Sequence, residues 1–183
     1  MRRAVFLDRD GVVNRSIVRD GKPYPPNSVG EMEILAGVPD ALSSLRKAGF
    51  LNIVVTNQPD IATGKQKAEV VEAMHQRLRN ELALDDIKVC RHRDADGCDC
   101  RKPKPGMLLQ AAREFDIDLE RSFMVGDRWR DVAAGQAAGC ISFFIDYGYR
   151  EKRPKPPYAE VKSLAGAGSR ILSEFIGKTR AKQ

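Results

Sequence analysis

The feature that most constrains this chain is a pair of aspartates, Asp8 and Asp10, at the end of an apolar run over 4–7. Such a run is typical of a buried β-strand, and residues two apart on an extended chain project to the same side. Two carboxylates are therefore held together where open α/β sheets bind their ligands. They persist so close together where a cation, a shared proton or catalysis requires them. Gly11 would then allow the chain to turn away sharply. The alternative is a solvated loop in which Arg9 balances one charge.

Apolar runs alternate with segments of helical periodicity along the chain. We expect strands at 4–8, 51–56, 87–90, 122–126 and 141–145. We expect helices at 38–48, 66–83, 105–115, 130–138 and 161–177. This alternation predicts an α/β fold, a doubly wound, Rossmann-like parallel sheet with helices on both faces.

The composition is ordinary for a globular protein, with 42% hydrophobic and 31% charged residues. No apolar run approaches the roughly 20 residues that span a bilayer, and the first one is too short for a secretory signal. We therefore expect a cytoplasmic protein. The net charge of +6 is concentrated at 149–155 and 178–182. Such runs are usually solvated tails, although a positive field also attracts phosphorylated metabolites.

Polar side chains follow two further strands of the predicted sheet. Thr56, Asn57 and Gln58 end the second strand and offer neutral donors to an oxyanion, although Thr and Asn also commonly begin loops. Asp127 and Asp131 follow the strand at 122–126.

These carboxylates predict a cation site. Asp127, Asp8 and the backbone carbonyl of Asp10 would supply oxygens to Mg²⁺, which typically takes few protein ligands and keeps several waters. Asp131 has a second interpretation, as the N-cap-like anion of the following helix.

A tetrahedral zinc set follows the third predicted strand. Its candidate ligands are Cys90, His92, Cys98 and Cys100. Three cysteines and a histidine fill all four positions, so the metal would be structural; the alternative is three free thiols and a surface histidine. Cys140 is interpreted as a small buried residue, and His75, on an apolar helix stripe, as a packing residue.

A basic segment follows the zinc set directly. Lys102 is a compact charge suited to a phosphoryl group, while Arg101 can bind a second anion through paired hydrogen bonds. A zinc-braced loop would hold both in place. Lys104 is interpreted as a residue that merely keeps the loop soluble.

The order Asp8-x-Asp10, Thr56, Lys102, Gly126-Asp127 resembles the four motifs of haloacid dehalogenase (HAD) superfamily phosphohydrolases, across nearly all of the chain up to about residue 145. More narrowly, the motifs and the Cys-x-His…Cys-x-Cys loop look like two related groups. These are the D-glycero-D-manno-heptose 1,7-bisphosphate 7-phosphatases and the histidinol-phosphate phosphatases.

The resemblance implies a magnesium-dependent hydrolysis in two steps. Asp8 would attack phosphorus, and Asp10 would protonate the leaving alkoxide and then activate water. Thr56 and Lys102 would hold the phosphoryl oxygens, and Mg²⁺ would be held by Asp8, Asp10 and Asp127. The substrate-binding candidates are Asn57, Gln58, Arg101 and Arg128.

The resemblance favours a heptose bisphosphate as substrate, with histidinol phosphate as the alternative because only five residues separate His92 from Cys98. Pro59-Asp60 departs from the heptose group, which typically has serine and glycine there, and the flap at 15–24 differs in length. No large cap insertion fits between the motifs, so we expect a small soluble phosphate ester as the ligand.

Two other classes of protein compete with this interpretation. A phospho-receiver also combines clustered aspartates, a threonine and a lysine, but in a different order. A zinc-braced nucleic-acid binder would suit the basic charge, but 7% aromatic content leaves little for base stacking. We expect one monomeric HAD-like domain over 1–183, with a flap at 14–37, a zinc loop at 90–101 and a C-terminal helix with a basic tail at 150–183.

Overall fold

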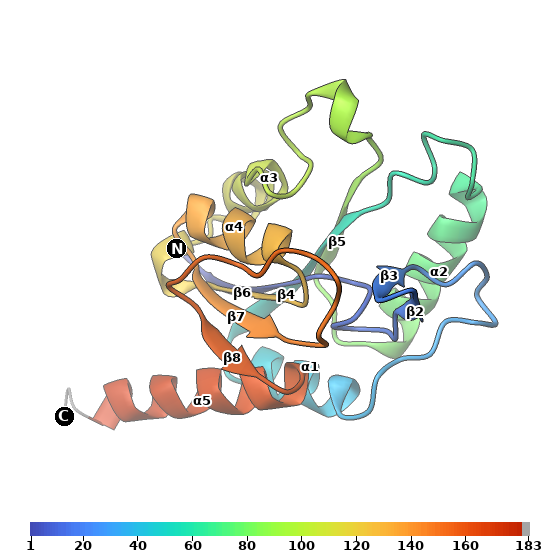
Figure 1. Ribbon diagram of the computed structural model, residues 1–183. Helices are drawn as coiled ribbons and strands as arrows, with labels where there is room; N and C mark the ends of the chain where they lie inside the picture. Colours follow the sequence, from blue (N-terminus) through green and yellow to red (C-terminus); the bar gives the residue numbers. More distant parts are fainter. Residues whose placement is uncertain (181–183) are drawn as a thin grey trace.

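The computed structural model describes residues 1–180 and shows a sheet enclosed between two layers of helices (Figure 1). The sheet has six strands in the order β5-β4-β1-β6-β7-β8, and every neighbouring pair is parallel. Its strands are β1 (Arg3–Leu7), β4 (Phe50–Asn57), β5 (Asp86–Cys90), β6 (Phe123–Gly126), β7 (Ile141–Ile145) and β8 (Ala159–Val161). The predicted doubly wound parallel sheet is confirmed.

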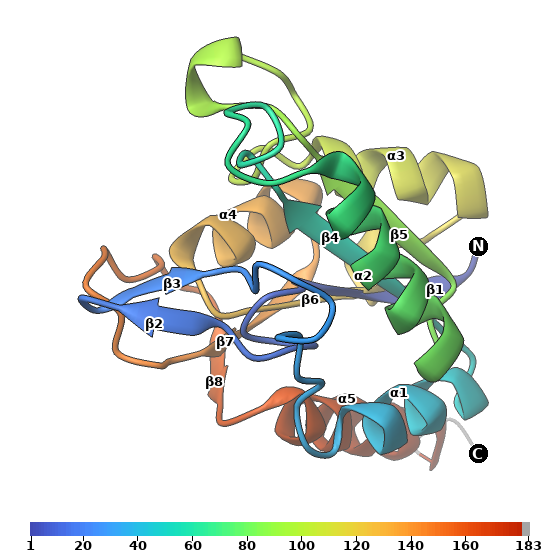
Figure 2. The same cartoon turned by 90° about the vertical axis from the view of Figure 1, so that its right-hand side faces the viewer.

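Helices cover both faces of the sheet, as the alternation of the sequence predicts. The helices are α1 (Val38–Lys47), α2 (Ala68–Glu81), α3 (Gly106–Phe115), α4 (Trp129–Ala138) and α5 (Leu164–Arg180). Side chains alternate along β1, so Val5 and Leu7 pack in one core with α1, α2 and α5. Ala4 and Phe6 pack in a second core with α3 and α4. Figure 2 shows the two layers on opposite sides of the strands.

Within the six-stranded sheet, β8 is the strand that the sequence pattern does not predict. Its three residues follow a proline-rich stretch and pair with β7, Phe144 opposite Glu160. The last helix consequently begins at Leu164, three residues later than the predicted start. Residues 181–183 of the expected basic tail lie outside the described residues.

The segment at 14–37 contains a small antiparallel hairpin of β2 (Ile17–Arg19) and β3 (Lys22–Tyr24). The hairpin projects from the body of the molecule (Figure 2). The 90–101 segment begins at Cys90, the last residue of β5, and then contains one short 3₁₀ turn, η1 (Asp94–Asp96), within irregular chain. Of the helices described, none has the length and apolar character needed to cross a membrane.

Candidate active site

Three buried carboxylates meet where β1 and β6 end. Asp8 follows β1 and Asp127 follows β6, and the two strands are neighbours with Leu7 opposite Val125. Asp131 lies in the first turn of α4. One carboxylate oxygen from each of these three aspartates lies within 4.8 Å of the others. We call Asp8, Asp127 and Asp131 the acidic cluster.

Lys102 is the cation that faces this cluster, and its side chain is 2% exposed. Its Nζ donates to Oδ1 of Asp8 at 2.8 Å, to Oδ1 of Asp131 at 2.6 Å and to the carbonyl of Val55 at 2.7 Å. An ammonium group has three hydrogens, so each has an acceptor. Burial lowers the pKa of Lys102, but the Asp131 and Asp8 carboxylates outweigh it and raise the pKa. Lys102 is therefore charged at neutral pH.

One lysine does not balance three carboxylates. Burial, followed by the charge of Asp131, raises the pKa of Asp8 to about 6, and burial followed by the charge of Asp8 raises the pKa of Asp127. Oδ1 of Asp127 is also buried without a hydrogen-bond partner among the described residues. Excess negative charge and an unpartnered carboxylate oxygen fit a divalent cation with a preference for oxygen ligands, such as Mg²⁺.

Asp131 satisfies both interpretations that the sequence leaves open. Its Oδ2 accepts the backbone N–H of Arg128 at 3.0 Å, as the third residue of a capping box rather than as the N-cap itself. Its Oδ1 binds Lys102. The sequence-predicted metal set contained Asp10 and omitted Asp131, whereas the side chain of Asp131 lies in the cluster.

The side chain of Asp10 points away from the acidic cluster, toward Arg9. Nε and Nη2 of Arg9 donate to both carboxylate oxygens at 3.0–3.2 Å. Asn14 and Gln58 each donate an amide hydrogen to Asp10 at 2.9 Å. Both carboxylate oxygens of Asp10 thus accept hydrogen bonds from neighbouring side chains.

The polar residues at the end of β4 bind neighbours within the protein. Asn57 donates to the carbonyl of Lys102 at 3.0 Å and accepts its N–H at 3.1 Å, so it fixes the backbone of Lys102. Gln58 donates to Oγ1 of Thr56 at 2.9 Å, which leaves the hydroxyl hydrogen of Thr56 for another acceptor. All three side chains line the cavity described next.

A cavity of about 440 Å³ opens over the site. Its lining includes Asp8, Asp10, Thr56 and Lys102, together with Pro59 and Asp60 and the four cations Arg19, Lys65, Arg128 and Arg130. Of these cations only Arg128 was a predicted substrate residue, and its guanidinium binds Glu151 at 2.6–3.1 Å. Nothing local in the sequence marks the other three as site residues.

Arg101, the predicted second-anion residue, lies elsewhere. Its Nε donates to Asp94 at 2.7 Å and its Nη1 to the carbonyl of His92 at 3.2 Å. Its side chain is not among the described residues that line the cavity. In this conformation Arg101 stabilises the 90–101 loop, which Lys102 follows directly.

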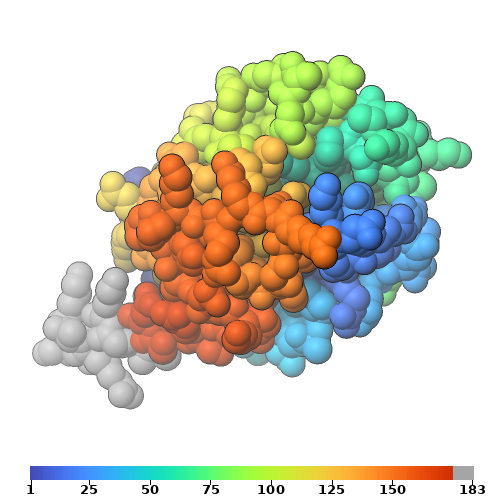
Figure 3. Space-filling model, in the orientation of Figure 1, coloured from blue at the N-terminus to red at the C-terminus, as the bar shows by residue number. Residues whose placement is uncertain are grey.

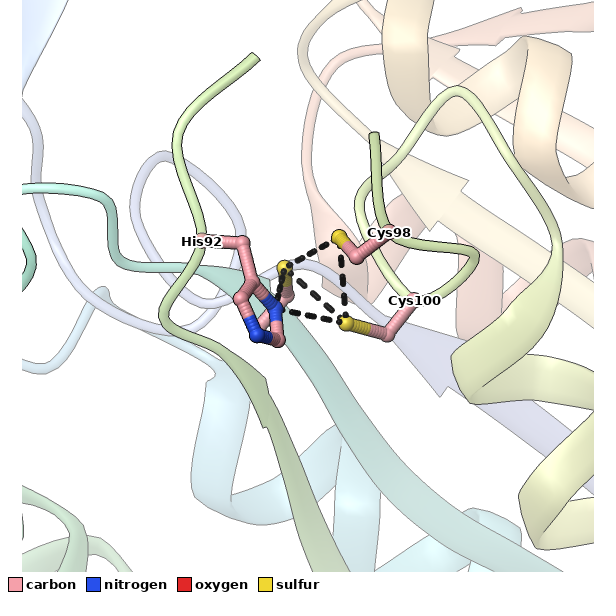
Figure 4. A group of neighbouring side chains, drawn as sticks. His92, Cys98 and Cys100 are labelled. Carbon is pink, nitrogen blue, oxygen red and sulfur yellow. Dashed lines mark hydrogen bonds between the residues drawn. The ribbon is translucent and has the colours of Figure 1, made fainter. Parts of the chain in front are cut away.

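The four candidate zinc ligands do converge. Figure 4 shows His92, Cys98 and Cys100 pointing toward one another, and Cys90 completes the group. Five of the six separations among the sulfur and Nδ1 atoms are 3.2–3.7 Å. A tetrahedron with zinc bonds of about 2.1–2.3 Å has edges of roughly 3.6–3.8 Å. Burial, followed by the hydrogen bond with Cys100, raises the pKa of Cys90 to about 12, so a thiolate here requires a cation.

The loop with these ligands packs closely on the following helix. The N–H of Gly106 donates to the carbonyl of Asp99 at 3.1 Å. A Cβ at Gly106 would lie 2.2 Å from that oxygen, so only glycine permits the approach. Lys102 therefore lies between two fixed points, the Cys/His group and the start of α3. Cys140 is buried, as predicted.

The chain is similar to proteins of known family. A HAD-hydrolase-like family model matches residues 99–167. The chain is 39% identical to the D-glycero-beta-D-manno-heptose-1,7-bisphosphate 7-phosphatase of Pseudomonas putida, over 95% of this chain and 99% of that protein. It is 40% identical to the protein of the same name from Pasteurella multocida, over 75% of this chain and 78% of that one.

A solved structure is similar throughout. The crystal structure of a D,D-heptose 1,7-bisphosphate phosphatase from B. bronchiseptica, complexed with magnesium and phosphate, has a TM-score of 0.81 and 31% identity. The match covers 94% of this chain and 99% of that one.

Proposed function

The chain belongs to the D-glycero-β-D-manno-heptose-1,7-bisphosphate 7-phosphatase family of HAD-like hydrolases, and on this premise we propose that it is a Mg²⁺-dependent phosphomonoesterase that removes the 7-phosphate of this heptose bisphosphate. The observation that carries the proposal is the acidic cluster with Lys102 beneath a cavity lined by cations. It supplies a nucleophile, a cation site and anion-binding groups together.

Asp8 is the proposed nucleophile because its two oxygens have different surroundings. Lys102 and the backbone N–H of Arg9 both donate to Oδ1, each at 2.8 Å. Among the described residues none donates a hydrogen bond to Oδ2. Oδ1 is thereby fixed while Oδ2 remains available to attack phosphorus, forming an aspartyl-phosphate as the P–O bond to the sugar breaks.

Asp10 is the proposed acid and base. A sugar alkoxide is a poor leaving group, so it needs a proton as the P–O bond breaks. Asp10 would donate that proton and then remove one from the water that hydrolyses the aspartyl-phosphate. Both oxygens of Asp10 accept hydrogen bonds in this structure, so one must be released before it can carry a proton toward substrate.

Asp8 and Asp127 would hold the divalent cation, with the backbone carbonyl of Asp10 as a further oxygen ligand. When bound, Mg²⁺ supplies positive charge between the nucleophile and the phosphoryl oxygens. Thr56 would donate its hydroxyl hydrogen to a phosphoryl oxygen. Lys102 would offset the charge that accumulates in the transition state.

A structural Zn²⁺ is proposed for Cys90, His92, Cys98 and Cys100. The separations among these ligands support a tetrahedral ion. The ion would fix the loop that ends at Lys102. It has no proposed contact with substrate.

The cavity cations favour a second phosphate on the substrate. Arg19 and Lys65 have no ion pair with any described residue, and both line the cavity. Histidinol phosphate, the alternative substrate, carries a cationic ammonium where the bisphosphate carries a second anion. The positive charges of Arg19 and Lys65 would repel this ammonium group. The five-residue spacer between His92 and Cys98 is the one feature that favours histidinol phosphate.

The test compares phosphate release from β-heptose 1,7-bisphosphate, heptose 7-phosphate and histidinol phosphate with Mg²⁺ present. We expect the bisphosphate to have the highest kcat/KM, by at least about tenfold, which corresponds to about 1.4 kcal/mol of transition-state binding. ³¹P NMR of the product should show the 1-phosphate retained. Equal or higher kcat/KM for histidinol phosphate would reject the heptose assignment and leave the phosphatase chemistry intact.

A further inference from the structure

Two tyrosines from the segment after β7 contact the backbone and side chains around the acidic cluster. Oη of Tyr149 donates to Oδ2 of Asp127 at 2.8 Å. Oη of Tyr147 donates to the carbonyl of Gly11 at 3.0 Å. The two rings lie 5.6 Å apart at an angle of 32°. Neither tyrosine belongs to the four motifs that the sequence presents.

Asp127 and Gly11, which accept these hydrogen bonds, are themselves in contact. A Cβ at Gly11 would lie 1.9 Å from Oδ2 of Asp127, so this carboxylate oxygen packs directly on the Gly11 backbone, where φ is +89°. The Asp127 carboxylate is therefore confined on one side by Gly11 and on another by Tyr149. Its other oxygen, Oδ1, is buried and unpartnered among the described residues.

We propose that Tyr149 is a positioning residue for the metal ligand Asp127, whose carboxylate it orients so that Oδ1 is presented to the divalent cation. The inference rests on the proposed function only in taking Asp127 as a ligand. A carboxylate ligand is held in a productive orientation by a hydrogen bond to its second oxygen. Tyr149 provides that bond without adding charge.

Contacts of the residues that follow Tyr149 fix this segment to the rest of the protein. Glu151, two residues on, forms the ion pair with Arg128 at the start of α4. The N–H of Arg150 donates to the carbonyl of Gly21 in the hairpin at 2.7 Å. Figure 3 shows this orange segment against the blue surface of the N-terminal region. The two residues that follow Tyr149 are thus anchored, one to the hairpin and the other to the start of α4.

The experiment measures Mg²⁺ binding to substrate-free protein by calorimetry. Tyr149→Phe removes the donor and keeps the ring, and we expect its Kd for Mg²⁺ to rise by about 10- to 100-fold. The matched control is Tyr158→Phe, a nearby tyrosine whose ring packs edge-on against Phe144 at 5.5 Å. We expect the control to keep the wild-type Kd within about twofold.

A second readout separates positioning from a general loss of structure. With excess Mg²⁺, Tyr149→Phe should regain most of the wild-type kcat, and its Tm in EDTA should match that of the wild type. An unchanged Mg²⁺ affinity in Tyr149→Phe, or an equal loss in Tyr158→Phe, would overturn the inference. If Tyr149→Phe does not fold, a second pair of variants takes its place. Tyr149→His keeps a hydrogen-bond donor on a ring and Tyr149→Leu has none, so the inference requires that Tyr149→His fold and bind Mg²⁺ more tightly than Tyr149→Leu. Absence of Mg²⁺ binding by the wild type would instead reject the proposed function.

Discussion

Nη1 of Arg9 lies 3.0 Å from Nε2 of His75, in the interior between the end of β1 and α2. A guanidinium only donates, so Nε2 accepts and Nδ1 carries the ring hydrogen. The same guanidinium binds Asp10 through its other nitrogens. The sequence pattern predicts His75 as a packing residue; it is buried as expected, but it also holds the arginine that holds Asp10.

The first prediction concerns Nε2 of His75, which accepts the hydrogen bond from Arg9. His75→Leu leaves a buried Arg9 donor without a partner, so we expect the free energy of unfolding to fall by about 1–3 kcal/mol. The kcat should fall as well, because Asp10 loses its fixed neighbour. His75→Gln places an amide oxygen near the position of Nε2 and should restore most of both quantities. Urea denaturation and steady-state kinetics measure them, and equal losses in the two variants would contradict the role of the acceptor.

A second prediction follows from the protonation of His75. Burial, followed by the charge of Arg9, lowers its pKa from 6.5 to about 4. Between these two values the unfolded chain binds more protons at this residue than the folded protein, so stability falls as pH falls from about 6.5 to 4. The pKa shift corresponds to a loss of up to about 3 kcal/mol in the free energy of unfolding over this pH range. His75→Gln should lose this component of the pH dependence, which urea denaturation at pH 4.5 and 7 would measure against wild type.

The third prediction concerns the nucleophile. Asp8→Asn should abolish turnover, because an amide oxygen does not form the aspartyl-phosphate, while circular dichroism should show an intact fold. Asp10→Asn should nearly abolish turnover of the sugar phosphate for lack of a proton donor. Asp40→Asn, at an exposed position in the first turn of α1, is the matched control. Wild-type rates in Asp8→Asn would reject the assignment of the nucleophile.

A fourth prediction concerns the Cys/His group. Cys98→Ala should lose bound zinc, lower the Tm and raise KM, because the loop that ends at Lys102 is no longer fixed. Cys140→Ala, a buried cysteine outside the group, should keep its zinc. Elemental analysis of the purified proteins gives the zinc content. If a Cys98→Ala protein is shown to contain no zinc and its KM is unchanged, zinc does not hold the loop in its functional position.

The last prediction concerns the cavity cations. Lys65→Ala should lower kcat/KM for the heptose 1,7-bisphosphate and leave that for the 7-monophosphate nearly unchanged, because only the former carries a second anion. Lys67→Ala removes an equal charge two residues away, from a side chain outside the cavity lining. Equal effects of Lys65→Ala on both substrates would show that Lys65 does not recognise the second phosphate.

Local sequence is enough to predict the strand–helix alternation and the polar residues at the ends of β1, β4 and β6. Apolar periodicity is a local property, and parallel strands bring their carboxyl ends to one edge. The same logic predicts that Asp8, Thr56 and Asp127 meet, and the resemblance to HAD phosphohydrolases adds Lys102. Asp8, Thr56 and Lys102 do line one cavity, and Asp127 lies with Asp8 in the acidic cluster. The close spacing of Cys98 and Cys100 likewise indicates a compact ligand group.

The partners of these residues depend instead on how distant elements pack. β8 forms because the edge of β7 is free to pair with it. The three residues of β8 follow a proline-rich stretch, and their own sequence does not indicate a strand. Asp131 lies in the acidic cluster because it binds Lys102. Arg101 lies outside the cavity because it binds Asp94. Tyr149 reaches Asp127 across 22 positions of sequence, and His75 reaches Arg9 across 66. Such pairs are fixed by tertiary packing, and local sequence carries no signal for them.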